Sequence, residues 1–345
     1  MSVTQWQNFL LFVSTIVLVG VLTPLMRKIA VSNEILDHPK SAHKSHLSPI
    51  PYLGGVAIIL GVAIVTYTAI IFTSLPFNNF WLATSLIGPA LTMGIIGLWD
   101  DIKNLHPFPR FIGQTVSAIV VAIILIFNDN FGSPTGSISI DMFITVLWVV
   151  GICNSINFFD NLDGGAAGTI AVSSLALTYL ATGNGQALIG SLSVVVAGAC
   201  LGFLIWNKSP ARIYMGDAGA LFLGVLIATL TIRLRPNTES VIASFATPMF
   251  LLAVPILDTS VAVISRLKRR VSPFQGGKDH LSHRLIRAGI PRRITALLLW
   301  LLSALFALLA IIINSSIPLN EFIAVTIGTL VWLVLLVRFI YTKNE

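Results

Sequence analysis

Apolar segments long enough to cross a membrane follow one another along almost the whole chain. A transmembrane helix needs about 20 mostly apolar residues, and only 10% of the 345 residues are charged, against about 25% in soluble domains. The segments lie at about 9–31, 52–73, 80–99, 109–127, 141–159, 166–182, 187–206, 217–234, 242–264, 293–314 and 321–341. The sequence therefore predicts an all-α polytopic membrane protein with 10–11 transmembrane helices. The count depends on whether the short, Gly- and Ala-rich segment 166–182 crosses fully.

The basic residues predict how these helices are oriented. Arg27 and Lys28 lie at the C-terminal end of the first segment, and basic residues tend to stay on the cytoplasmic side. The N-terminus is therefore expected outside, and the loop 24–50 is expected in the cytoplasm. With eleven crossings, only two of the 21 Lys and Arg residues fall on the outer side, Arg233 and Arg235. The chain shows no domain boundary or internal repeat, so one integral membrane domain is predicted over all 345 residues.

The basic charge and the cysteines have simple interpretations in such a protein. The formal net charge of +7 does not indicate a nucleic-acid partner, because the orientation rule already places many basic residues in the loops. Membrane lipids are the expected contact instead. Cys153 and Cys200 lie inside apolar segments, so both are expected to be buried and to form no disulfide.

Aspartate and histidine gather at the predicted cytoplasmic ends of the helices. All six histidines and eight of the ten aspartates fall there, although the orientation rule does not account for Asp or His. Mg²⁺ takes one or two carboxylates and completes its shell with phosphate oxygens and water. The pattern therefore predicts a site for Mg²⁺, with Mn²⁺ as a substitute ion, and for phosphorylated substrates at the cytoplasmic membrane surface.

Two polar clusters mark the ends of the third and fifth segments. Asp100 and Asp101 are adjacent, and ionising both near a membrane is costly unless a cation compensates. A metal or proton-transfer role is favoured over a solvated helix end. In the second cluster, polar residues recur at intervals of three: Asn154, Asn157, Asp160 and Asp163. A helix cap needs one such residue rather than four, and Gly164 and Gly165 then allow a tight turn whose amides could approach an anion.

The stretches 207–224 and 279–284 supply further candidates. Asp217 opens an apolar segment; a lone Asp there is often a helix cap, but the neighbouring Asn207, Lys208 and Arg212 favour a binding role. In the second stretch, DHLSHR, three donors that suit phosphate would share one face of a helix: His280, His283 and Arg284. The alternative for this stretch is a surface helix that contacts anionic lipid.

Two other positions are less decided. The first cytoplasmic loop places His43 and His46 beside Lys44, which repeats the combination of histidine and basic residues seen near the C-terminus. Asp258 lies within the ninth segment, near its predicted inner end. A buried partner for Lys or Arg and a catalytic role are both open for Asp258.

Five blocks, in this order, resemble the polyprenyl-phosphate N-acetylhexosamine-1-phosphate transferases: the loop 37–55, the pair Asp100–Asp101, and the stretches 154–164, 207–219 and 280–284. The resemblance implies Mg²⁺-dependent transfer of a sugar-1-phosphate from a UDP-N-acetylhexosamine to a polyprenyl phosphate such as undecaprenyl phosphate, with release of UMP. It implies an active site on the cytoplasmic face of a bacterial plasma membrane. The product would start a lipid-linked cell-envelope glycan, as in cell wall biogenesis, lipopolysaccharide or teichoic acid. A homodimer is one assembly that fits.

The resemblance also implies roles for individual residues. Asp217 would ligate Mg²⁺, with Asp100 and Asp160 as further ligands. Asp100 and Asp101 would position or deprotonate the lipid phosphate, and Asp160 and His280 would complete the catalytic group. The residues expected to bind substrate are Asn154, Asn157, Asp163, Asn207, Tyr214 (against uracil), Lys44, His46, Lys103, His283 and Arg284.

Three positions depart from the usual pattern of that family. Ser282 stands where enzymes that use UDP-GlcNAc commonly have His, His43 stands where Arg is usual, and Gly165 replaces Leu. The chain has no run of three histidines, which argues against the muramyl-pentapeptide branch and favours the undecaprenyl-phosphate GlcNAc-1-phosphate branch. UDP-GlcNAc is therefore the expected donor, with UDP-GalNAc and UDP-MurNAc-pentapeptide as alternatives.

Two other protein classes fit the sequence less well. A secondary transporter would place its polar residues near the middle of the membrane, between broken helices, whereas the carboxylates here are predicted at one membrane face. An intramembrane metalloprotease would need an H-E-x-x-H motif, and the sequence contains none.

Overall fold

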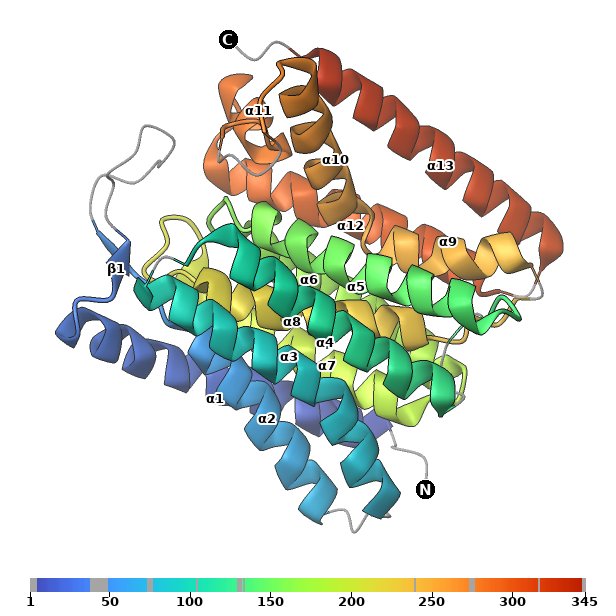
Figure 1. Ribbon diagram of the computed structural model, residues 1–345, viewed down its shortest axis with the longest axis horizontal. Coiled ribbons are helices and arrows are strands. Elements are labelled where there is room, and N and C mark those ends of the chain that lie inside the picture. The colour runs from blue at the N-terminus through green and yellow to red at the C-terminus, as the bar shows by residue number, and fades with distance from the viewer. Residues whose placement is uncertain are drawn as a thin grey trace.

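The computed structural model describes residues 5–37, 49–72, 77–103, 105–128, 132, 134–238, 240–272, 277–315 and 317–342. Its helices are α1 (Gln5–Ser32), α2 (Gly54–Phe72), α3 (Phe77–Lys103), α4 (Pro107–Phe127), α5 (Ile138–Phe159), α6 (Gly165–Gly183), α7 (Ala187–Asn207), α8 (Gly216–Arg233), α9 (Val241–Leu251), α10 (Ala253–Lys268), α11 (Leu281–Arg287), α12 (Arg292–Ile313) and α13 (Pro318–Tyr341). Two short strands, β1 (Leu36–Asp37) and β2 (Ile50–Pro51), pair antiparallel before α2. Figure 1 shows the helices side by side, with α1 and α2 along one edge and α13 along the opposite one.

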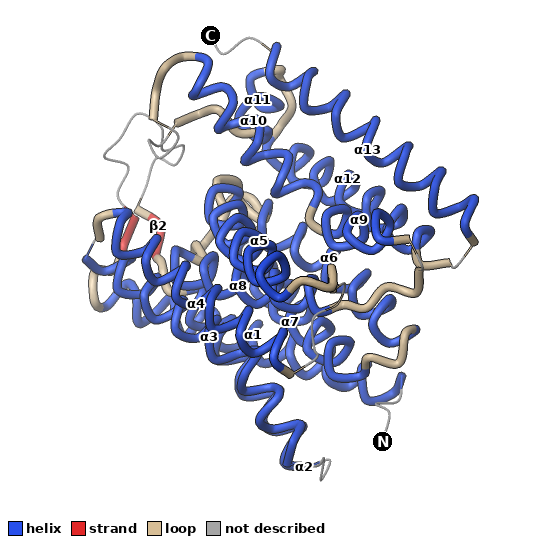
Figure 2. Tube along the Cα trace, turned by 45° about the vertical axis from the view of Figure 1, so that its right-hand side comes forward, coloured by secondary structure: helices blue, strands red, loops and turns tan. Residues whose placement is uncertain are grey.

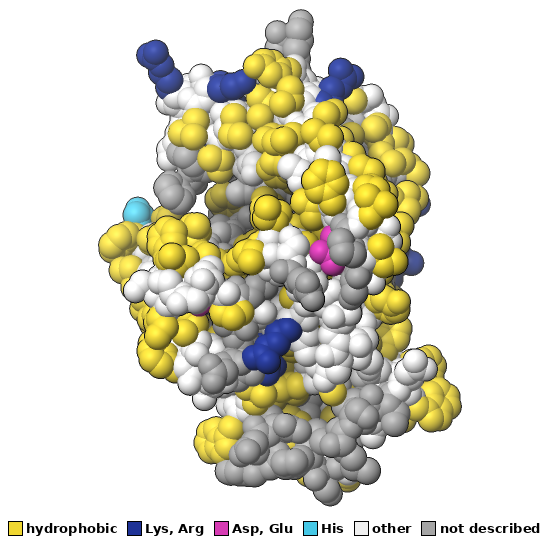
Figure 3. Space-filling model, turned by 90° about the vertical axis from the view of Figure 1, so that its right-hand side faces the viewer, with side chains coloured by type: hydrophobic (Ala, Val, Ile, Leu, Met, Phe, Trp, Pro, Cys, Tyr) yellow, Lys and Arg dark blue, Asp and Glu magenta, His cyan; other side chains and the backbone are white. Residues whose placement is uncertain are grey.

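The helical spans agree with the predicted polytopic class. Within the described residues, ten single helices are long and apolar enough to cross a membrane. The uncertain segment 166–182 is one of them, as α6. Large apolar side chains are exposed along α1, α4 and α13, and Figure 3 shows hydrophobic side chains spread over one face with few charged ones among them. Such surfaces suit contact with lipid.

The ninth predicted span, 242–264, is not one straight helix. It is divided at Leu252 into α9 and α10, which meet at an angle of 78°. Pro255 lies in the first turn of α10 and has no amide hydrogen to donate to Leu251, so a continuous helix would lose a hydrogen bond here. The indole of Trp332 in α13 donates to the carbonyl oxygen of Ala253, 3.2 Å away, and so satisfies one backbone acceptor at the break.

Helix α8 forms the centre of the bundle, and most of its residues are buried. It packs against α3, α5 and α2. The approach of α3 is close, because a Cβ atom added at Gly97 would overlap the carbonyl group of Asp217. The two helices therefore bring the end of α3, which carries Asp100 and Asp101, directly against the beginning of α8.

The short strands hold the entrance of α2 near the same region. Pro51 accepts a hydrogen bond from the amide of Tyr214 at 2.9 Å, and Gly54 donates to the carbonyl oxygen of Tyr214 at 3.0 Å. Figure 2 shows the strands at one end of the molecule. The all-α prediction is confirmed, and this pair of two-residue strands ties the first loop to the segment before α8.

Candidate active site

Asp101 caps the helix that carries Asp217. Its two carboxylate oxygens accept the amides of Asp217 and Ala218 at 2.8 and 3.0 Å, so a carboxylate from α3 satisfies two of the free donors at the N-terminus of α8. Gly216, with φ of 68°, provides the sharp entry and leaves room for Asp101. The structure therefore shows Asp101 placing Asp217, and its contact with the lipid phosphate stays a prediction.

Asp100 and Asp217 converge on Arg110, which lies in the first turn of α4. The Nη1 atom of Arg110 is 2.5 Å from Oδ2 of Asp100 and 2.5 Å from Oδ2 of Asp217. The other oxygen of Asp100 accepts the amide of Leu105 at 2.6 Å. Sequence reasoning missed Arg110, although the demand of paired carboxylates for a nearby cation pointed to a basic residue close to Asp100 in the chain.

Asn157 belongs to this site, whereas Asn154 supports it from one turn away. The Nδ2 atom of Asn157 donates to Oδ1 of Asp217 at 2.7 Å. Asn154 donates to Oε1 of Gln114 at 2.7 Å and to the carbonyl oxygen of Val150. Asn154 therefore ties α5 to α4, and its contact with substrate stays a prediction.

Asp160 directly follows the last residue of α5, and the negative charge of Asp217 acts on its carboxyl group. Burial, and then the charges of Asp217 and Asp163, raise the pKa of Asp160 to about 7. Its carboxyl group is therefore partly protonated near neutral pH. A bound cation would favour the ionised form and lower this pKa.

The turn after Asp160 is fastened to the loop before α8. Gly164 has φ of 71°, and its amide donates to Oδ1 of Asn207 at 2.9 Å. Nδ2 of Asn207 donates to the carbonyl oxygen of Ile213 at 2.9 Å, and the residue is 2% exposed. Asp163 accepts the amide of Ala211 at 3.1 Å. Asn207 thus joins two loops from a buried position and is not placed to line a nucleotide pocket, which corrects that prediction.

Tyr214 and Lys103 lie at the edges of this region. The Tyr214 ring is 6.5 Å from the Tyr52 ring, and burial followed by the charge of Asp163 raises the pKa of its hydroxyl. Lys103 is exposed at the end of α3. The other two predicted substrate ligands of the N-terminal half, Lys44 and His46, lie outside the described residues.

A buried ionic network arranges the C-terminal loop. Oδ2 of Asp258 is 2.7 Å from Nδ1 of His280, and Oδ1 accepts the amide of Leu281 at 2.7 Å. Nη2 of Arg266 is 3.3 Å from Nε2 of His280, so both ring nitrogens of His280 have a protein partner. The question left open for Asp258 is answered by this geometry. It holds a histidine and the start of α11.

The same loop contacts the turn after α5. The hydroxyl of Ser282 donates to Oδ1 of Asn161, and the His280 ring meets the edge of Phe158 at a centroid distance of 6.4 Å. His283 is close to His280, and burial followed by that neighbour's charge lowers its pKa to about 4. His283 is therefore neutral near pH 7, and its Nδ1 has no hydrogen-bond partner in the part of the chain that the structure describes.

Arg284 is a structural residue and does not face a substrate. It is 1% exposed. Its guanidinium donates to four protein acceptors: the carbonyl oxygens of Asp279, Phe339 and Thr342 and the hydroxyl of Ser265. It therefore fastens α11 to α10 and to the end of α13, which corrects its predicted role in holding pyrophosphate or sugar.

The structural role of Arg284 predicts a loss of stability when its side chain is removed. We expect Arg284→Ala to lower the free energy of unfolding by about 3 kcal/mol, because it leaves buried acceptors without a donor. Thermal denaturation of the purified protein measures the loss, with exposed Arg287→Ala as the matched control from the same helix. A variant with wild-type thermal stability and only a raised KM would contradict the structural assignment.

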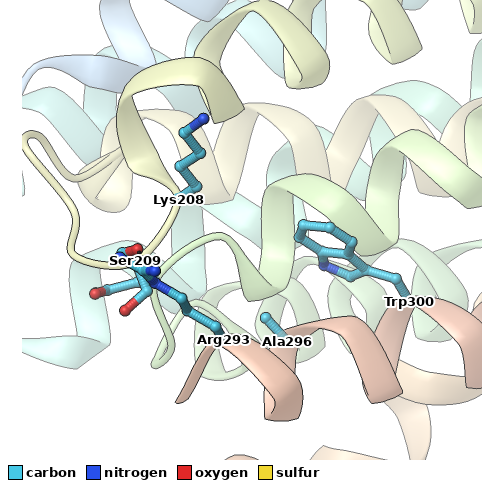
Figure 4. Close-up of a pocket in the computed structure, with 6 residues that line it drawn as sticks. Lys208, Ser209, Arg293, Ala296 and Trp300 are labelled. Atoms are coloured by element: carbon cyan, nitrogen blue, oxygen red, sulfur yellow. Dashed lines mark hydrogen bonds between the residues drawn. The ribbon is translucent and has the colours of Figure 1, made fainter. Parts of the chain in front are cut away.

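A cavity of about 390 Å³ borders Asp163 on the side of α12. Figure 4 shows Arg293, Ala296 and Trp300 along α12, facing Lys208 and Ser209. Arg293 donates to the carbonyl oxygen of Ser209 at 2.9 Å, and Trp300 donates to that of Gly164 at 3.1 Å. The cavity thus adjoins both loops that position Asp217.

The donor set around Asp217 suits a hard divalent cation, although it is not a ready-made cage. Within the described residues, no three His, Cys, Asp or Glu side chains are arranged to hold a metal ion. The carboxylates of Asp100 and Asp217 do converge on one cationic nitrogen, Nη1 of Arg110. Mg²⁺ commonly uses one or two carboxylates and takes its other ligands from phosphate and water, so these two residues fit it.

Comparison with known proteins shows the family to which the chain belongs. The family model for glycosyl transferase family 4 matches residues 83–235. A probable undecaprenyl-phosphate N-acetylglucosaminyl 1-phosphate transferase of Bacillus subtilis (strain 168) is 33% identical over 310 residues, covering 88% of this chain and 84% of that protein. The chain is therefore an enzyme of the polyprenyl-phosphate N-acetylhexosamine-1-phosphate transferase family.

Two further relatives show the range of the family. A decaprenyl-phosphate N-acetylglucosaminephosphotransferase of Mycolicibacterium smegmatis is 30% identical over 307 residues, covering 81% of this chain and 75% of that protein. A phospho-N-acetylmuramoyl-pentapeptide-transferase of Desulforamulus reducens is 29% identical over 322 residues, covering 87% and 92%. The predicted family is confirmed, and the muramoyl-pentapeptide relative has lower identity than the two N-acetylglucosamine relatives.

Proposed function

We propose that the protein transfers N-acetylglucosamine-1-phosphate from UDP-GlcNAc to undecaprenyl phosphate, with release of UMP, at the cytoplasmic face of a bacterial plasma membrane. The observation that carries the proposal is the convergence of Asp100, Asp217 and Asn157 from three helices. The charge of Asp217 also acts on Asp160. Both substrates are phosphorylated and repel each other. A site that has carboxylates to bind a divalent ion, and that also contains a guanidinium, therefore suits this reaction.

In this reaction an oxygen of the lipid phosphate attacks the β-phosphorus of the UDP-sugar. The bond from that phosphorus to the oxygen bridging it to the α-phosphate breaks, and UMP leaves. Mg²⁺, held by Asp217 and Asp100, would neutralise phosphate charge when bound. Asp160, which the bound cation would keep ionised, is the group that we assign to accept a proton from the lipid phosphate. Asn157 orients the Asp217 carboxylate through its 2.7 Å hydrogen bond.

The choice of sugar rests on the relatives and on one loop. Two of the relatives are named for N-acetylglucosamine. Ser282, which departs from the usual histidine, is bound to Asn161, so this loop still lies against the turn that carries Asp160 and Asp163. His283, neutral and only partly buried, is the member of the loop that we assign to substrate binding.

The test is UMP release by the purified protein with undecaprenyl phosphate, Mg²⁺ and one UDP-sugar at a time. We expect UMP with UDP-GlcNAc, only when the lipid phosphate is present, and no UMP when the metal is removed with a chelator. A response to UDP-GalNAc or UDP-MurNAc-pentapeptide alone would change the sugar but keep the chemistry. No lipid-dependent UMP from any UDP-sugar would overturn the proposal.

A further inference from the structure

Arg110 occupies the place between two carboxylates where a cation is needed. One nitrogen, Nη1, lies 2.5 Å from an oxygen of Asp100 on α3 and 2.5 Å from an oxygen of Asp217 on α8. These two oxygens are therefore no more than about 5 Å apart, whereas two oxygens on opposite sides of Mg²⁺ are about 4 Å apart. This upper limit includes the spacing that Mg²⁺ requires, so a divalent ion can contact both oxygens once Arg110 has withdrawn from them.

The surroundings make this cation necessary. The Asp100 side chain is 7% exposed and that of Asp217 is 28% exposed. Asp101 is next to both, through its bonds to the first amides of α8, and the charge of Asp217 also reaches Asp160. Two carboxyl groups thus contact one guanidinium, and the carboxyl groups of Asp101 and Asp160 interact with the charge of Asp217. Such a cluster keeps its arrangement only if a cation remains within it.

The position of Arg110 at the start of α4 allows its side chain to move away from the two carboxylates. It lies in the first turn of α4, after His106 and Pro107, and its side chain is 25% exposed. A long side chain at a helix start can swing away from the carboxylates without breaking any helical hydrogen bond. Asp100 remains held by the amide of Leu105, and Asp217 by Asn157.

We propose that Arg110 is the positioning residue of the metal-free site. It holds Asp100 and Asp217 together until a divalent cation takes its place, so Arg110 and the cation compete for the same two carboxylates. This inference rests on the metal dependence of the proposed function. Because Arg110 must leave the two carboxylates before the cation binds, the metal binds more weakly than it would to the carboxylates alone.

The competition can be measured without turnover. Mn²⁺ binding to the purified full chain is followed by loss of the electron paramagnetic resonance signal of free aqueous Mn²⁺. We expect Arg110→Gln to bind Mn²⁺ about tenfold more tightly than the wild type, because no guanidinium then competes with the ion through charge-assisted hydrogen bonds to the carboxylates. Arg110→Lys, which keeps a cation but not the planar fork, should fall between the two.

Controls separate competition from general effects. Arg212→Gln removes one positive charge from the loop that precedes Asp217, where Arg212 stacks on Trp206, and it should leave the Mn²⁺ affinity unchanged. Asp217→Asn should weaken binding in both the wild-type and the Arg110→Gln backgrounds. Without metal, Arg110→Gln should melt at a lower temperature than the wild type, and saturating Mn²⁺ should raise its Tm by more.

The outcomes distinguish this inference from the proposed function. If the wild type binds Mn²⁺ through Asp217 and Arg110→Gln binds no more tightly, the competition is wrong and the metal site stands. If Asp217→Asn does not weaken Mn²⁺ binding in either background, both the competition by Arg110 and the assignment of Asp217 as a metal ligand are wrong. If Arg110→Gln does not fold, the comparison of Arg110→Lys with the wild type decides, and equal affinities would overturn the inference.

Discussion

Asp217→Asn abolishes turnover: we expect UMP release to fall on the order of 10³-fold or more, with the protein still folded. The substitution keeps the shape of the side chain and removes the charge that Arg110 contacts at 2.5 Å and that a divalent ion would need. Asp101 still caps α8, because it bonds to the backbone of residue 217 and not to its side chain. The measurement is lipid-dependent UMP release, together with a thermal melt.

The matched control for this loss is Asp141→Asn, at the other end of α5. Asp141 is buried and accepts hydrogen bonds from the amide and the hydroxyl of Thr135 through one oxygen, which an Asn side chain can reproduce. We expect this variant to keep its activity. Wild-type turnover by Asp217→Asn would remove Asp217 from the reaction, and loss of activity in both variants would point to a general effect of removing aspartates.

Gly97→Ala should disrupt the site without touching any charged residue. The added Cβ would overlap the carbonyl group of Asp217, which is backbone and cannot rotate away. We expect overpacking to cost about 1–3 kcal/mol of stability. Because α3 must move away from α8, we also expect turnover to fall about 10²-fold, as for a displacement near 1 Å.

Gly88→Ala, on the same helix, is the control for this second prediction. A Cβ added at Gly88 meets no described atom within 4 Å, so the intrinsic preference of Ala for helix should leave it as stable as the wild type or slightly more stable. Thermal melts and UMP release of the two variants test the pair. Equal behaviour at positions 97 and 88 would show that the contact between α3 and α8 does not control the site.

The membrane architecture was largely predictable, because burial in lipid leaves a direct mark on the sequence. Ten of the eleven predicted apolar segments are single helices in the structure, including 166–182, because the mean hydropathy of a segment depends on its local composition alone. The break at Leu252 was missed. The sequence contains Pro255, but it does not distinguish a proline in the first turn of a new helix from one inside a kinked helix.

The site was predictable as a region but not contact by contact. The rule that paired carboxylates need a cation is local chemistry, and it led to Asp100 and Asp101, whereas Asp217 was selected for its polar and basic neighbours. It did not choose between Asp100, which binds Arg110, and Asp101, which caps α8. Neighbours in sequence point in different directions on a helix, so their roles separate only when α3 is packed against a particular partner.

For this protein, the sequence by itself determined the helical membrane class, the family and the set of polar residues from which the site is made. The tertiary structure decided which of those residues face one another. It placed Asn207 and Arg284 in the interior as supports and introduced Arg110, which no motif contained. The physical reason is that hydropathy and motif chemistry are properties of short segments. A contact between α3, α4 and α8 depends instead on how closely their backbones approach, which small residues such as Gly97 permit only in the folded bundle.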